Sequence, residues 1–201
     1  MVSHIVGSAL GITVTVLCVI FAALNSNAIG VVSAAIYGAT MILLYTMSSI
    51  YHGLTNIKAK KVFQVLDHCT IYLLIAGSYT PIALSAIRRV DPAAGWILFG
   101  LEWGCAAFAI VFTAIDFKKY AILSYSFYII MGWALIAIPG LAREALTDKG
   151  FMMMLTGGIV YSVGAVFYAI GSKKRYMHNV FHVFVVAGSL LQFFPILFYA
   201  L

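Results

Sequence analysis

Long apolar runs dominate this sequence and leave it few folds to adopt. A helix needs about 20 apolar residues to span the hydrocarbon core of a bilayer, and the runs are too long for the strands of a membrane barrel. Because backbone groups in lipid must pair within their own segment, we expect helices. The chain is predicted to be an all-α integral membrane protein, a single seven-helix transmembrane domain over residues 1–201. The seven expected spans are about 5–24, 28–51, 62–87, 93–115, 120–141, 151–171 and 178–200.

The composition agrees with a membrane protein. Hydrophobic residues make up 64% of the chain and charged residues only 9%, whereas soluble domains carry roughly 25% charged residues. The first run could be read as a signal peptide, because small residues at 26–28 resemble a cleavage site. However, no lysine or arginine precedes it, and it exceeds the usual apolar length of about 7–15 residues. We therefore expect a retained helix.

The basic residues are distributed unequally between the two sides of the expected bundle. The second, fourth and sixth loops hold eight of them: Lys58, Lys60, Lys61, Lys118, Lys119, Lys173, Lys174 and Arg175. The opposite side holds four: Arg88, Arg89, Arg143 and Lys149. By the positive-inside rule the N-terminus is predicted to be cytoplasmic and the C-terminus outside. This role explains the net charge of +6, and no nucleic-acid partner is predicted.

Ionisable residues are costly inside a membrane, so each one in an expected span is a candidate functional residue. In the predicted topology, His52 ends the second helix at the cytoplasmic side. Asp67 lies early in the third helix, and His178 and His182 open the seventh. All four are therefore expected at similar depth in the inner leaflet.

Helical spacing also places these residues on shared faces. His178 and His182 are four residues apart, as are Ser48 and His52, so each pair lies on one side of its helix. Small and polar residues share these faces and indicate that they point inward: Gly188, Ser189 and Gln192 beside the histidines, and Thr70, Gly77 and Ser78 beside Asp67.

Three imidazoles with a carboxylate or water form the ligand set of a catalytic zinc site. The absence of a thiolate in the set favours zinc over other imidazole-bound metals. Hydrogen bonding between helices is the simplest alternative for any one histidine. A bis-histidine haem is another, although it leaves one histidine of the four-residue pair unused. A zinc transporter is a third, but the outer halves of the spans offer little polar surface beyond Glu102.

Three further ionisable residues are expected outside the site. His68 lies about 100° around its helix from Asp67, so we interpret it as a structural or outer-layer residue. Glu102 lies deeper in the membrane than the proposed cluster. His4 precedes the first span on the cytoplasmic side, where it could help line the site or be solvated, and we favour the solvated position.

These residues, in this order, resemble the hemolysin III branch of the progestin and adipoQ receptor (PAQR) family. The resemblance is carried by "SSIYH", "LDHCTIYLLIAGSYTP" and "HNVFHVFVVAGSL", and it extends over nearly the whole chain. It implies a zinc ion (Zn²⁺) held by His52, His178 and His182, with Asp67 holding or polarising its water and Ser48 nearby. The long N-terminal domain of the animal receptors is absent, which points to the bacterial branch. The expected location is the cell (plasma) membrane, as a multi-pass protein of the bacterial inner membrane.

The family is grouped with alkaline ceramidases in a proposed superfamily of membrane hydrolases. This grouping leads to the hypothesis of a zinc-dependent hydrolase of a lipid amide or ester, with membrane lipids as partners. Asp67 would be the general base and then the acid, and Ser48 would steady the oxyanion or the water. The alternative is a non-enzymatic, zinc-stabilised membrane sensor or a cytolytic protein of the hemolysin type.

Overall fold

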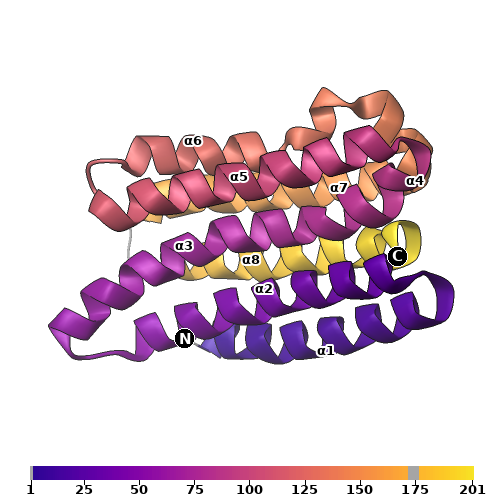
Figure 1. Ribbon diagram of the computed structural model, residues 1–201. Coiled ribbons are helices and arrows are strands. Elements are labelled where there is room, and N and C mark those ends of the chain that lie inside the picture. The colour runs from indigo at the N-terminus through magenta and orange to yellow at the C-terminus, as the bar shows by residue number, and fades with distance from the viewer. Residues whose placement is uncertain (1, 172–176) are drawn as a thin grey trace.

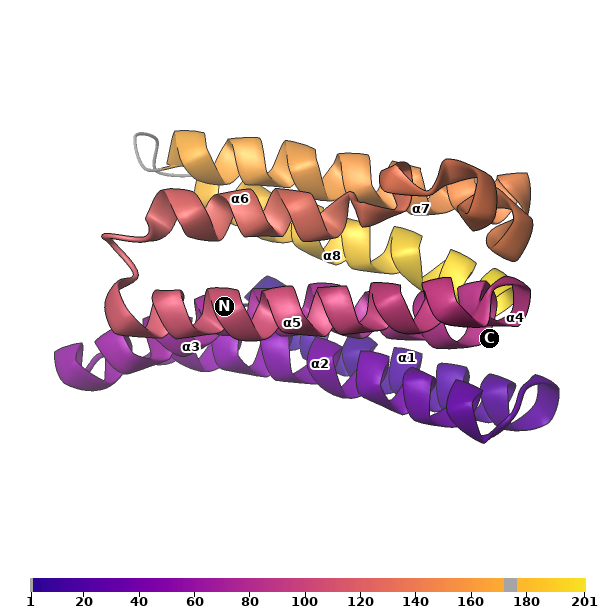
Figure 2. The same cartoon turned by 45° about the horizontal axis from the view of Figure 1, so that its top comes forward.

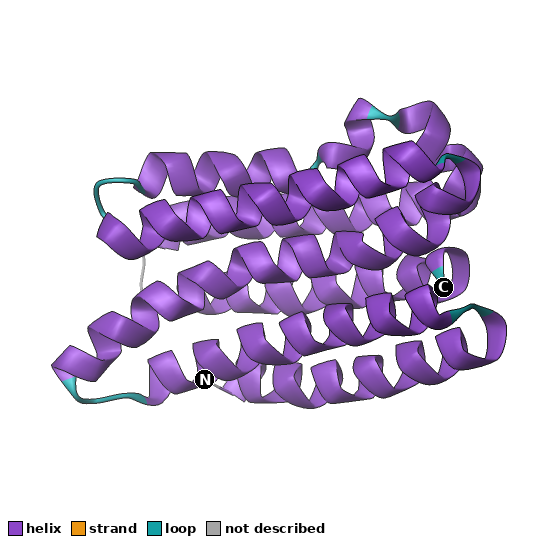
Figure 3. Ribbon diagram, in the orientation of Figure 1, coloured by secondary structure: helices purple, strands orange, loops and turns teal. Residues whose placement is uncertain are grey.

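Helices make up nearly all of the chain that the structure describes (Figure 3). The computed structural model describes residues 2–171 and 177–201, with side chains for 4–168 and 179–201. The α-helices are α1 Val2–Asn25, α2 Ala28–Gly53, α3 Ile57–Pro81, α4 Arg88–Val90, α5 Pro92–Asp116, α6 Ala121–Gly132, α7 Pro139–Gly171 and α8 Met177–Pro195. The remaining helical segments are η1 Ile82–Ile87, η2 Ala134–Ala137 and η3 Ile196–Ala200.

The long helices lie side by side and alternate in direction along the chain (Figure 1, Figure 2). Contacts join α1 to α2, α2 to α3, α3 to α5, and α7 to α8. In the most apolar stretch of the helix that begins with α3, 83% of the residues are buried, compared with 28% in α1. The third helix is therefore the central one, and residues on it can reach several neighbours.

Six helices in the described part of the chain are long and apolar enough to cross a bilayer: His4–Asn25, Ala28–Gly53, Ile57–Val90, Pro92–Asp116, Pro139–Tyr168 and Asn179–Ala200. Large apolar side chains are exposed on their outer faces, for example Val16 on α1 and Val111 on α5. Apolar surface of this kind is stable when it faces lipid. The chain is a helical, multi-pass membrane protein.

The expected span 120–141 is not a continuous helix. α6 ends at Gly132, a 3-10 turn covers Ala134–Ala137, and α7 begins at Pro139. The 12 residues of α6 rise about 18 Å, which is less than the roughly 30 Å of hydrocarbon. α7 also starts earlier than expected and is kinked at Thr147, whose φ is 63°. A seventh complete crossing therefore stays a prediction.

Three polar side chains fix where the helices begin. Asn27 accepts hydrogen bonds from the backbone of the first turn of α2, and Asn56 and Asp91 do the same for α3 and α5. Such caps satisfy N–H groups that have no partner within the helix, and each contributes about 1 kcal/mol. These starting points set the depth of every residue along the helices that follow.

Two prolines change the helical pitch at one end of the bundle. Pro81 and Pro195 lack a backbone N–H, so the regular i to i−4 hydrogen bond is lost at each. Each is followed by a π-helical segment, η1 and η3 respectively. The two segments contact one another, and Arg89 donates to the Ala200 carbonyl at 2.9 Å. The C-terminus thus packs at the end of the bundle opposite to the N-terminus (Figure 1).

The described basic residues separate to the two ends of the bundle, as the alternating helices require. One end carries the exposed residues Lys58, Lys60, Lys61, Lys118 and Lys119. The other end carries Arg88, Arg89, Arg143 and Lys149. The first group lies at the same end as the N-terminus (Figure 1).

Candidate functional site

Polar residues from four helices gather at the N-terminal end of the bundle. Ser48 and His52 lie in the last turns of α2, and Asp67 lies in the third turn of α3. His182 lies near the start of α8, and His4 lies near the start of α1. Antiparallel packing brings these helix ends together, which is the depth match that the sequence predicts.

The centre of the site is a group of three imidazole rings. The ring centroids of His52 and His182 are 4.9 Å apart, with the rings nearly perpendicular. His4 lies 4.0 Å from His182 and 6.1 Å from His52, again between centroids. The Nε2 of His4 and the Nδ1 of His182 share a hydrogen bond. His4 and His182 are buried, and His52 is half-buried.

The prediction that His4 is solvated is therefore wrong. Its side chain is only 2% exposed, and the ring of Tyr45 lies 5.5 Å away between centroids. The reason is that α1 packs closely along α2, which carries residue 4 into the bundle instead of leaving it at the surface. No signal within α1 alone distinguishes a buried histidine here from a solvated one.

The third expected ligand, His178, lies in the first turn of α8, but its side chain is outside the described residues. Among the side chains that the structure describes, no three of His, Cys, Asp and Glu are grouped so as to hold a metal ion. The zinc triad of His52, His178 and His182 therefore stays a prediction, with two of its members placed side by side.

Ser48 and Asp67 form the second part of the site. The Ser48 hydroxyl lies beside the Asp67 carboxylate, which brings α2 and α3 together at this point. Ser48 is buried and Asp67 half-buried. Ser48 lies one turn before His52 on the same helix face, so this pair is one helical turn from the His52 imidazole.

A hydrogen-bonded network joins α8 to its neighbours in the turns after His182. The Ser189 hydroxyl is 2.7 Å from the Tyr45 hydroxyl and 2.6 Å from the Tyr161 hydroxyl. Tyr45 also donates to the Val185 carbonyl at 3.3 Å. These contacts hold the turn of α8 that follows His182, and they join it to α2 and α7.

The inward faces that the sequence indicates are confirmed. Gly188, Ser189 and Gln192 are buried on α8, as are Thr70, Gly77 and Ser78 on α3. The close approach of α2 to α3 requires glycine at position 77, because a Cβ there would lie 2.0 Å from Thr40 Oγ1. Small residues at these positions let α3 and α8 pack into the centre of the bundle.

His68 and Glu102 lie apart from the cluster. The His68 ring stacks on Phe117 at the end of α5, 4.1 Å between centroids, and its backbone carbonyl accepts from the Tyr128 hydroxyl. Glu102 is buried in the middle of α5. Its Oε2 has no hydrogen-bond partner among the described residues.

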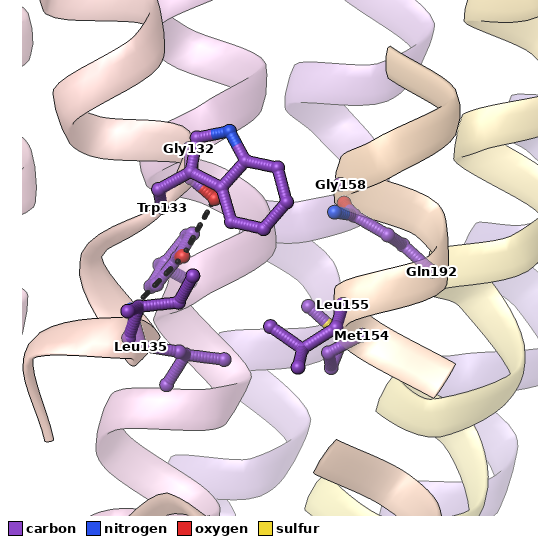
Figure 4. Close-up of a pocket in the computed structure, with 9 residues that line it drawn as sticks. Gly132, Trp133, Leu135, Met154, Leu155, Gly158 and Gln192 are labelled. Atoms are coloured by element: carbon purple, nitrogen blue, oxygen red, sulfur yellow. Dashed lines mark hydrogen bonds between the residues drawn. The ribbon is translucent and has the colours of Figure 1, made fainter. Parts of the chain in front are cut away.

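A small cavity lies beside the break after α6 (Figure 4). The Tyr79 hydroxyl donates to the Gly132 carbonyl at 3.0 Å and accepts from the Leu135 N–H at 3.4 Å. Trp133 and Gln192 face one another across the space (Figure 4). Its volume of about 10 Å³ is close to the least that holds one water molecule. This cavity is too small for a lipid group, so it is not a substrate site.

Comparison with known proteins identifies the family. The family described as "Haemolysin-III related" matches residues 1–193. The chain belongs to this haemolysin III family. It is 39% identical over 200 residues to Hemolysin-3 of Bacillus cereus, covering 100% of this chain and 90% of that protein. It is 38% identical to the Hemolysin-3 homolog of Bacillus subtilis (strain 168), covering 98% and 91%.

A more distant relative in the comparisons is human. The chain is 25% identical over 171 residues to monocyte to macrophage differentiation factor of Homo sapiens, covering 82% of this chain and 69% of that protein. The match connects the haemolysin III chain to the wider PAQR family and agrees with the resemblance found in the sequence.

The residues of the site include side-chain types that zinc binds. His52 and His182 offer nitrogen atoms from neighbouring rings, and the carboxylate of Asp67 lies beside Ser48, one turn before His52. Nitrogen and oxygen ligands of this kind suit zinc, and a ligand with a partner on its second nitrogen is typical of such sites. The two described imidazoles are compatible with a metal, and the third ligand of the predicted triad, His178, lies outside the described side chains.

Proposed function

We propose that the protein is a zinc-dependent intramembrane hydrolase of a lipid amide or ester. The observation that carries the proposal is the contact between the His52 and His182 rings, with Ser48 and Asp67 side by side one helical turn from His52. Three separate helices contribute these residues at one depth. Ionisable groups are costly inside a membrane. Helix packing alone would not require a carboxyl group and two imidazoles at this depth.

In the proposal, His52, His178 and His182 hold the zinc. Zinc, when bound, polarises a carbonyl and lowers the pKa of a water molecule towards neutrality. Asp67 accepts a proton from the attacking water while the water oxygen bonds to the carbonyl carbon. The carbon–nitrogen or carbon–oxygen bond to the leaving group then breaks, and Asp67 returns the proton to that nitrogen or oxygen. Ser48 donates its hydroxyl hydrogen to Asp67 and orients the carboxylate.

The location of the site suits a lipid substrate. The cluster lies towards one end of the bundle, the end that carries the exposed lysines in the first turns of α3 and in the loop after α5. By the positive-inside rule this end faces the cytoplasm. We place the protein in the cell membrane with its N-terminus inside, so that the site lies near the headgroups of inner-leaflet lipids.

The experiment compares the wild type with Asp67→Asn in detergent and in lipid vesicles. Zinc per chain is measured by elemental analysis, and fatty acid released from ceramide and from ester lipids is measured by mass spectrometry. We expect one zinc per chain in both proteins, with release at least about 100-fold slower in the variant, since general acid–base catalysis contributes about 10²–10⁴-fold. Asp116→Asn, at the exposed end of α5, is the matched control and should keep wild-type activity.

Two outcomes contradict the proposal. Zinc content that is equal in the wild type and in a His178→Ala, His182→Ala double variant would show that the imidazoles do not hold the metal. Zinc-loaded protein that releases no fatty acid from either lipid class would exclude the hydrolase. In that case, lysis of erythrocytes by purified protein would test the second candidate, a cytolytic role, which the name of the Bacillus cereus relative suggests.

A further inference from the structure

His4 is the one imidazole of the cluster that the proposed zinc triad does not use. It is 2% exposed, and its Nε2 shares a hydrogen bond with the Nδ1 of His182. Its ring lies nearly perpendicular to that of His182, at 84°. The contact therefore joins nitrogen to nitrogen at the ring edges, and it is not a stack of ring faces.

The packing of α1 on α2 brings His4 to this position. A Cβ on Gly7 would lie 2.4 Å from Cδ1 of Tyr45, and one on Gly11 would lie 3.3 Å from the backbone nitrogen of Ile42. Hydrogen atoms at these two positions let the helices approach more closely than side chains allow. Gly7 lies three residues after His4 and so faces the same direction. The glycines thus hold the start of α1 against the imidazoles.

In a metal-binding histidine, the hydrogen bond made by one ring nitrogen decides whether the other nitrogen is available to the metal. A partner on one ring nitrogen fixes the tautomer and the ring orientation, and loss of that partner commonly lowers metal affinity about 10–100-fold. His182 has its Nδ1 engaged with His4. A proton on Nδ1 leaves the lone pair of the opposite nitrogen, Nε2, for a ligand.

We propose that His4 is a positioning residue for His182. The Nε2 of His4 accepts the Nδ1–H of His182 and so directs the Nε2 of His182 to the metal. This inference rests on the proposed function, since it assumes that His182 is a zinc ligand. It assigns to the first helix a role in metal binding that the zinc triad on α2 and α8 does not include.

The test measures zinc affinity by chelator competition in purified protein, together with the visible spectrum of the cobalt-substituted form. Two substitutions of similar polarity separate the roles of His4. In His4→Gln the amide oxygen reaches close to the former Nε2 and can accept the His182 proton. In His4→Asn the side chain is one carbon shorter and does not reach. His68→Leu, a buried histidine that packs on Phe117, is the matched control.

We expect His4→Asn to weaken zinc binding about 10–100-fold, while His4→Gln and His68→Leu stay within a few-fold of the wild type. The cobalt spectrum of His4→Gln should match that of the wild type. Equal affinity of His4→Asn and the wild type would overturn the inference and leave the proposed function intact. Loss of zinc from His4→Gln to the level of His182→Ala would also overturn it, by showing that His4 is itself a ligand. Absence of zinc from the wild type would overturn the proposed function and this inference together.

Discussion

Replacing Gly7 by alanine should destabilise the protein, although alanine is the better helix former. The new Cβ would lie 2.4, 2.6 and 2.7 Å from Cδ1, Cε1 and Cγ of Tyr45. Tyr45 cannot move aside easily, because it is fully buried and its hydroxyl is bound to Ser189 at 2.7 Å. The substitution must therefore push α1 away from α2.

The size of the effect follows from two opposing terms. Overpacking of a well-packed core costs about 1–3 kcal/mol, whereas exchanging glycine for alanine within a helix contributes about 1 kcal/mol of stability. The matched control is Gly104→Ala on α5, where a Cβ meets nothing within 4 Å. Gly104→Ala gains the helix propensity of alanine without overpacking. The free energies of unfolding of the two variants should therefore differ by about 1–3 kcal/mol.

The assay is thermal unfolding of both variants and the wild type in the same detergent. For a chain of this size, 1 kcal/mol shifts the midpoint by about 2–4 °C. We expect Gly104→Ala at or above the wild-type midpoint and Gly7→Ala below that of Gly104→Ala. Equal midpoints for the two variants would refute the close packing of α1 on Tyr45, and with it the explanation of how His4 reaches the cluster.

Two further substitutions test features away from the site. Tyr79→Phe removes the hydroxyl that pairs the Gly132 carbonyl and the Leu135 N–H. It should lower the free energy of unfolding by about 1–3 kcal/mol, because buried backbone groups lose their partner; an unchanged denaturation midpoint in detergent would contradict this. Glu102→Gln replaces a buried carboxyl group whose Oε2 has no partner in the described chain. Its unfolding midpoint at neutral pH should be at least that of the wild type, and a clear decrease would indicate that the carboxyl group is needed.

Local features of the sequence predict most of the helices. The expected spans 5–24 and 28–51 correspond to α1 and α2 within three residues at each end. The length of an apolar run predicts that a helix forms, and a capping side chain such as Asn27 predicts where the helix starts. Helix periodicity also places Ser48 and His52 on one face, and the alternation of direction brings Asp67 and His182 to their depth. These parts of the site follow from spacing alone.

The rest depends on contacts between helices that are distant in the sequence. The break after Gly132 is held by Tyr79 of α3 and by Ser162 of α7, which accepts from the Trp133 indole at 3.1 Å. The burial of His4 depends on the fit between Gly7 and Tyr45. A run of apolar residues contains no information on such partners. The continuous helix over 120–141 and the solvated His4 are therefore the predictions that are wrong.

The position of His4 has a practical consequence for any recombinant form of this protein. A polyhistidine tag fused ahead of Met1 would begin a few residues from three clustered imidazoles. Its own imidazoles would compete for zinc and could displace the start of α1. The last residues of the chain lie at the far end of the bundle (Figure 1), where Ala200 and Leu201 are buried. A cleavable tag without histidine, joined to the C-terminus through a flexible linker, leaves the metal analysis interpretable.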